Sequence, residues 1–164
     1  MANIAAGGHF SLLHTVCGRV FAFGNNASGQ LGLGDKETRY LPEAVTALDS
    51  LTIVQMAAGK EHSLFLTGCG QVLTCGRRTV TPLAHVDDLK DQLMPEIIVS
   101  LEHFRVTQIA AGSAGSLLLG EDGQALQALV SGERPDCRHT TRVSWFHWNE
   151  AAACVERVIC PHHD

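Results

Sequence analysis

Basic clusters and long apolar runs are both missing from this sequence of 164 residues. The longest run of Lys and Arg is Arg77-Arg78, and the net charge is −5 at pH 7. Because nucleic-acid-binding domains usually carry a basic stripe that neutralises phosphates, we expect no direct binding of DNA or RNA. No segment approaches the roughly 18 apolar residues of a membrane span. Met1-Ala2-Asn3-Ile4 also lacks the basic start of a secretion signal, so we expect a cytoplasmic or nuclear protein.

The motifs of common enzyme classes are missing as well. There is no Gly-x-x-x-x-Gly-Lys-Ser/Thr loop, no Gly-x-Gly-x-x-Gly after a strand, no Gly-x-Ser-x-Gly elbow and no His-Glu-x-x-His. Asp87 and Asp88 are adjacent in a polar stretch, which is typical of solvated charges. His62 has no evident nucleophile to serve, so we expect a packed, hydrogen-bonded histidine there. These absences predict a non-catalytic protein without a cofactor.

What the sequence does contain is an internal repeat. The tripeptide Ala-Ala-Gly occurs at 5–7, 57–59 and 110–112, with steps of 52 and 53 residues. A second landmark keeps the same register, because the segment 42–48 (PEAVTAL) recurs 53 residues later as 95–101 (PEIIVSL). Several landmarks with one spacing indicate repeated structural units.

Each unit consists of short apolar or alternating runs bounded by Gly, Pro and Asp, which predicts strands joined by tight turns. Gly18, Gly70 and Gly123 stand where a hairpin needs a positive φ, which glycine adopts without steric cost. A unit of about 50 residues with roughly four short strands is typical of a β-propeller blade. The sequence therefore predicts an all-β fold with two full units and part of a third in residues 1–130.

Two motifs extend this prediction. Residues 24–35 read GNNASGQLGLGD, and residues 59–64 read GKEHSL. The first resembles the glycine loop of the RCC1 (regulator of chromosome condensation) family, and the second resembles that family's Gly-x-x-His-Ser-Leu element. The alternating glycines allow a tight loop, and Leu31 and Leu33 can bury as a pair, whereas a flexible Gly/Ser linker rarely carries two such leucines. The residues assigned to the structural repeat motif are Gly24, Asn26, Gly29, Gln30, Leu31, Gly32, Leu33, Gly34, Gly59, His62, Ser63 and Gly76.

The resemblance implies β-propeller blades, but the sequence departs from the family's pattern. A complete propeller of this family resembles a closed ring of seven blades, so this chain supplies an incomplete ring. The glycine loop occurs once, and 77–82 (RRTVTP) replaces it in the second unit. The position of His62 is Phe10 in the first unit and Gly115 in the third. A short array leaves exposed the sheet faces and edges that a closed ring would cover. One expected outcome is therefore that copies of the chain associate and complete the propeller.

Residues 131–164 break the repeat and are predicted to form a divergent C-terminal tail. We expect one short helix there, over 150–160, with Asn149 as its cap and Pro161 as its stop. Four residues of types suited to zinc, two Cys and two His, also occur in the tail, but their Cys-x-His spacing matches the usual zinc motifs poorly. These weak metal candidates are Cys137, His139, Cys160 and His162. Non-native sequence from alternative splicing or a shifted frame is a second explanation for the change in composition.

The sequence leaves three functional hypotheses open. The first is a non-enzymatic protein–protein interaction module, for which the resemblance implies a protein partner such as a small GTPase or a chromatin-associated protein. Some relatives are guanine-nucleotide exchange factors, which act by binding. The second is a truncated isoform or fragment without independent activity. The third is a structural zinc-binding protein that uses the tail.

Overall fold

The computed structural model describes residues 3–77, 79–80, 91–101, 104–113 and 115–130. Within these ranges the chain forms short strands and two single-turn 3-10 helices. None of the helices described has the length and hydropathy needed to cross a membrane. The elements are β1 (Asn3–Ala6), β2 (Phe10–His14), β3 (Val20–Gly24), β4 (Arg39–Ala44), η1 (Thr46–Leu48), β5 (Ile53–Ala58), β6 (His62–Thr67), β7 (Val72–Gly76), β8 (Thr79–Val80), β9 (Gln92–Ile97), η2 (Val99–Leu101), β10 (Val106–Ala111), β11 (Gly115–Gly120) and β12 (Ala125–Val130).

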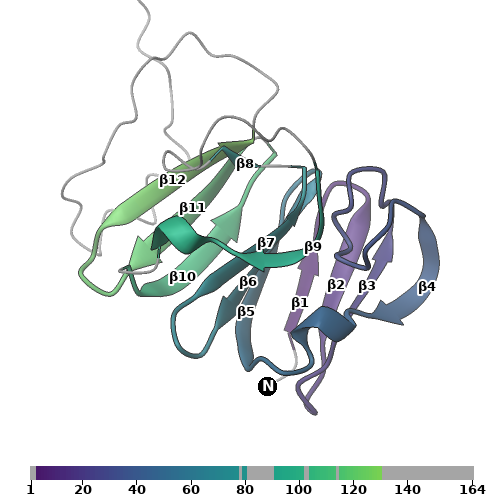
Figure 1. Cartoon of the computed structure of the whole chain (residues 1–164), viewed down its shortest axis with the longest axis horizontal. Coiled ribbons are helices and arrows are strands. Elements are labelled where there is room, and N and C mark those ends of the chain that lie inside the picture. Colours follow the sequence, from purple (N-terminus) through teal and green to yellow (C-terminus); the bar gives the residue numbers. More distant parts are fainter. Residues whose placement is uncertain (1–2, 78, 81–90, 102–103, 114, 131–164) are drawn as a thin grey trace, which may run out of the picture.

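The strands form three antiparallel sheets of four strands each. Their orders are β1-β2-β3-β4, β5-β6-β7-β9 and β10-β11-β12-β8, which we call blade 1, blade 2 and blade 3. Blade 2 lies between the other two (Figure 1). Each Ala-Ala-Gly tripeptide ends the first strand of its blade, so the period of 52 to 53 residues is the step from blade to blade. The predicted all-β, blade-like architecture is confirmed.

The hairpin turns between the second and third strands are alike in all three blades. Gly18, Gly70 and Gly123 have φ angles of 85°, 84° and 79°. A side chain would strain the backbone in this left-handed region, so the recurrent glycine is explained by the turn. This agrees with the prediction from the sequence.

Blade 3 reaches four strands in an unexpected way. Its outer strand is β8, which lies between β7 and β9 in the sequence and pairs only through Val80 with Leu129 and Thr79 with Val130. The sequence predicts a partial third unit, and within the described residues β10, β11 and β12 are the strands of blade 3 that follow in the expected order. Pairing with β8 satisfies backbone groups at the edge of β12 that would otherwise be open.

The apolar core lies between the blades and falls into two clusters. In the first, Leu12 and Val20 of blade 1 pack with Phe65 of blade 2, all at most 1% exposed. In the second, Leu64 of blade 2 packs with Leu118 of blade 3. Each blade therefore has two faces. We call the face of blade 2 that meets blade 1 its leading face, and the face that meets blade 3 its trailing face. The equivalent faces of blades 1 and 3 have the same names.

Candidate interaction surface

The glycine loop, residues 24–35, follows β3 and is held in one shape by a buried side chain. Asn26 is 0% exposed. Its Oδ1 accepts a hydrogen bond from the backbone N–H of Leu31 at 2.9 Å, and its Nδ2 donates to the carbonyl oxygen of Asp35 at 2.9 Å. One amide thus joins the middle and the end of the loop. The contacts describe an ordered element rather than a flexible linker.

The same loop packs on blade 2. Gly34 N–H donates to the carbonyl oxygen of Leu93 at 3.0 Å, and the hydroxyl of Ser63 donates to the carbonyl oxygen of Gln30 at 2.6 Å. Leu31 is 0% exposed and belongs to the core between blades 1 and 2. A Cβ on Gly29, whose φ is 80°, would lie 2.6 Å from Leu93 Cδ2, so a side chain there would clash as well as strain the backbone.

The remaining motif residues of the loop support this docking. Gln30 is 2% exposed, and its Oε1 accepts a hydrogen bond from the N–H of Ser28 at 2.9 Å. Gly32 lies against Pro95 and Cys75, and Leu33 is partly buried against the core. Gly24 and Gly76 end β3 and β7 at equivalent places in blades 1 and 2. Through these contacts the glycine loop joins blade 1 to blade 2.

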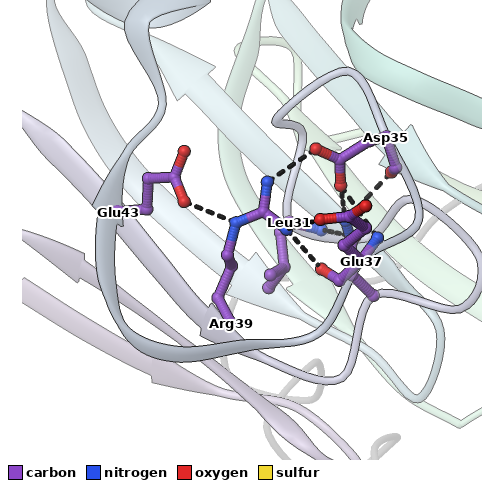
Figure 2. Close-up of polar contacts among 6 residues, drawn as sticks. Leu31, Asp35, Glu37, Arg39 and Glu43 are labelled. Atoms are coloured by element: carbon purple, nitrogen blue, oxygen red, sulfur yellow. Dashed lines mark hydrogen bonds and ion pairs between the residues drawn. The ribbon is translucent and has the colours of Figure 1, made fainter.

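An ion-pair network anchors the exit of the loop to β4. The guanidinium of Arg39 binds the carboxylates of Asp35, at 2.6 Å, and Glu43, and it donates to the carbonyl oxygen of Glu37 at 2.9 Å. Figure 2 shows Arg39 between these three partners. Hydrogen bonding to Arg39 lowers the pKa of Asp35, and the same bond raises the pKa of Arg39. The planar, multidentate guanidinium fixes the direction in which β4 leaves the loop.

Beside this network β4 presents two large exposed side chains. Tyr40 is 90% exposed and Leu41 is 78% exposed. They follow Arg39 directly, and Glu43 and Glu37 lie on the same network. We call these two residues the Tyr40–Leu41 patch. Exposed tyrosine is one of the residue types that often carry the binding energy of protein interfaces, so the patch is a candidate interaction surface.

A proline in β4 disfavours pairing of its free edge with another strand. Pro42 stands in the middle of β4 and has no backbone N–H to donate. Pro95 takes the equivalent place in β9 of blade 2. The outer strands therefore favour contact through side chains rather than addition of a further strand.

His62 is placed inside the protein, between blades 2 and 3. It is 0% exposed, and its Nε2 lies 2.7 Å from the hydroxyl oxygen of Ser116, which is 2% exposed. Its ring occupies the space that a side chain on Gly59 would need, as the ring of Phe10 does above Gly7 in blade 1. Burial lowers the pKa of His62 to about 4.

A histidine–serine contact is the arrangement of an activated nucleophile, but the rest of such a site is missing here. Both groups are buried, so a substrate cannot reach them. Nδ1 of His62 has no hydrogen-bond partner among the described residues, whereas a catalytic imidazole is oriented through that atom. The geometry therefore describes a polar contact between blades.

The other candidates from the sequence lie outside the described residues. The weak zinc candidates of the tail, the predicted helix over 150–160 and the pair Asp87-Asp88 all fall there. Within the described ranges no group of three or more His, Cys, Asp or Glu side chains could hold a metal ion. The described cysteines, Cys17, Cys69 and Cys75, are free thiols.

Sequence reasoning did not single out Arg39, Tyr40, Leu41 or Gln55. Gln55 crosses from blade 2 to blade 3, where its Nε2 donates to the carbonyl oxygen of Ile109 at 2.9 Å and its Oε1 accepts from the N–H of the same residue at 3.0 Å. A signal for Gln55 exists, because Gln108 recurs 53 residues later. No comparable repeat marks Arg39, Tyr40 or Leu41.

Comparison with known proteins agrees with this architecture. Residues 17–66 match the regulator of chromosome condensation (RCC1) repeat. The chain is 35% identical over 134 residues to the human probable E3 ubiquitin-protein ligase HERC3, an alignment that covers 82% of the chain and 13% of HERC3. It is 32% identical to the rat probable E3 ubiquitin-protein ligase HERC4, with 96% of the chain and 17% of HERC4 covered.

Solved structures give the same result. Prp20p from Saccharomyces cerevisiae superposes with a TM-score of 0.67 and 25% identity over 76% of this chain and 32% of that one. Human WBSCR16 superposes with a TM-score of 0.66 and 24% identity over the same shares. The chain thus spans less than a fifth of the two ligases and about a third of the solved chains. The repeat match, the blade architecture and these similarities show that the chain belongs to the RCC1 repeat family.

Proposed function

We propose that the chain is a non-catalytic protein-binding module that engages its partner through the Tyr40–Leu41 patch. The observation that carries the proposal is the exposure of two large apolar side chains, 90% and 78%, on a strand that an ion-pair network holds in place. The two residues are consecutive in β4, so their side chains point to opposite sides of this outer strand and expose apolar area on both. Ordering the strand in advance reduces the entropy lost on binding.

Small GTPases are the partner class we place first, with chromatin-associated proteins second. The structure of Prp20p, similar to this chain at 25% identity, is described together with its binding to Gsp1p and histones. In the network that flanks the patch, the three acids Asp35, Glu37 and Glu43 outnumber the single cation Arg39, and this excess of negative charge would favour a basic partner surface. Such a module would act in the cytoplasm or the nucleus. If it stimulates nucleotide exchange, it does so by binding, without covalent chemistry.

The similarity to HERC ligases supports a role in protein recognition, and we do not propose ubiquitin ligation for this chain. The alignments cover 13% and 17% of HERC3 and HERC4, so they do not assign the activity of those whole proteins to this chain. A module of this kind would supply recognition. Its net charge of −5 and the acids around the patch also argue against direct binding of nucleic acid.

The test is the affinity of the purified chain for a panel of nucleotide-free small GTPases and for histones, measured by biolayer interferometry. The proposal predicts that one class binds and that Leu41→Glu weakens the interaction at least tenfold, because an unpaired carboxylate is costly to bury in an apolar contact. Val16→Glu is the matched control, since Val16 is 81% exposed but lies in the turn between β2 and β3. Binding that Leu41→Glu leaves unchanged, or no binding to either class, would refute the proposal. Release of a fluorescent nucleotide from the bound GTPase then tests exchange activity.

A further inference from the structure

Blade 1 presents a leading face whose counterparts in the other two blades are buried in the core or packed against it. Cross-strand pairing places Ile4 beside Leu13 and Leu13 beside Phe21. The equivalent rows are Met56, Phe65 and Leu73 in blade 2, and Ile109, Leu118 and Leu126 in blade 3. Ile4 is 77% exposed, whereas its counterparts Met56 and Ile109 are 5% and 4% exposed. The leading face of blade 1 thus has the composition of an interface between blades without the neighbouring blade.

Blade 3 presents the complementary trailing face. Leu117 is 39% exposed, while the equivalent residues Leu12 in blade 1 and Leu64 in blade 2 are 0% and 2% exposed. In blades 1 and 2 these leucines are buried in the clusters that receive the leading face of the next blade. The two halves of the repeated interface are therefore both open, one at each end of the array.

One polar contact between blades 2 and 3 also has an equivalent of each of its two halves at the ends of the array. Gln55 of blade 2 forms its two hydrogen bonds with the backbone of Ile109 in blade 3. Gln108 occupies the equivalent position of blade 3, after the same irregularity in strand pairing, and its side chain is exposed. Ile4 occupies the position of Ile109 in blade 1. The chain therefore carries, at one end, a glutamine amide at the equivalent position and, at the other end, the backbone groups of the residue type that Gln55 binds.

We propose that a second copy of this chain is the partner of these two faces, with its blade 1 seated on blade 3 of the first copy. Leu117 and Gln108 of one copy would then contact Ile4 and its apolar row in the next, as Leu64 and Gln55 contact blade 3 within one chain. Both the apolar row and the amide contact match position by position, which is an argument for self-recognition rather than for an unrelated partner. Such a head-to-tail contact forms a ring if the rotation closes and an open chain if it does not. The inference goes beyond the proposed function, because it uses neither Tyr40 nor Leu41.

The test combines two variants of the full chain in sedimentation velocity over a range of concentrations. Wild type should sediment at a multiple of its monomer mass of 17.6 kDa. Leu117→Glu blocks the trailing face of blade 3, and Ile4→Glu blocks the leading face of blade 1, so each variant alone should be a monomer. Their mixture should form a 1:1 dimer, because each retains the face that the other has lost. Gln108→Ala should weaken the assembly by about tenfold, as expected for loss of two neutral hydrogen bonds.

Leu41→Glu is the matched control and should assemble like wild type, which separates this proposal from the proposed function. Far-UV circular dichroism of each variant checks that the blades still fold. A wild type that stays monomeric at all concentrations would overturn the proposal. Failure of the two variants to form a mixed dimer would overturn it too, because a symmetric contact through one face would not be rescued by mixing.

Discussion

Acid should weaken the contact between blades 2 and 3 through a single buried histidine. The pKa of His62 falls from an ordinary value near 6.5 to about 4 because burial disfavours the charged ring. Above pH 6.5 neither the folded nor the unfolded chain protonates His62, so its contribution to stability does not change with pH. Between pH 6.5 and 4 the unfolded chain binds a proton that the folded chain does not, so stability falls as pH falls. The loss approaches about 3 kcal/mol at pH 4, at roughly 1.4 kcal/mol per pH unit.

The assay is urea unfolding followed by circular dichroism at pH 7.5, 6 and 5, with wild type compared to His62→Phe. Phenylalanine is the replacement that blade 1 itself uses, since Phe10 packs above Gly7 as His62 packs above Gly59. The variant loses the hydrogen bond to Ser116 and should be less stable at pH 7.5. By pH 5 that deficit should shrink by about 2 kcal/mol, because the variant has no ring to protonate.

The matched control is His9→Gln, which removes an exposed histidine in place of the buried one. A constant difference between wild type and His62→Phe from pH 7.5 to 5 would refute the reasoning. It would mean that His62 is protonated as readily in the folded chain as in the unfolded one.

Two further predictions test the packing between blades. Gly59→Ala should destabilise the chain by about 2 kcal/mol or more in thermal unfolding, because its Cβ would overlap the His62 ring and lie 2.7 Å from a backbone oxygen. Gly112→Ala, whose Cβ would meet its nearest atom at 3.5 Å, should stay within about 1 kcal/mol of wild type, and equal effects of the two would contradict the packing described. Thiol labelling of the native chain, read by peptide mass spectrometry, should modify Cys17 and Cys69 well before Cys75. The first two are exposed with pKa values lowered by threonine hydroxyls, while burial raises the pKa of Cys75 to about 12, so rapid labelling of Cys75 would be inconsistent with this core.

The repeat and its turns could be predicted from the sequence because they depend on local rules. Gly18, Gly70 and Gly123 recur since each hairpin needs the same backbone angle, and the apolar runs recur since each strand packs in the same way. Leu31, predicted to be buried, is 0% exposed. The boundary at residue 130 and the character of 131–164 remain predictions, because that segment lies outside the described residues.

The contacts that join the blades could not be predicted, because they depend on which face of one sheet meets the next. Gln55 and Gln108 look alike in the sequence, yet one binds the adjacent blade and the other is exposed. Arg39 also belongs to no recognisable sequence motif. Its ion pair with Asp35 forms because the glycine loop brings Asp35 back beside β4. Strand β8 shows the same limit, since pairing at long range is set by an open edge rather than by a local pattern.

The central claim is that this RCC1-repeat chain recognises a protein through the Tyr40–Leu41 patch on a strand ordered beforehand. Hydrogen–deuterium exchange of the chain, alone and with the partner that binds most tightly in the GTPase and histone panel, tests it most directly. The account predicts that added protection on binding is concentrated in peptides that contain β4 and the end of the glycine loop. Protection confined to blades 2 and 3, with β4 unchanged, would contradict it.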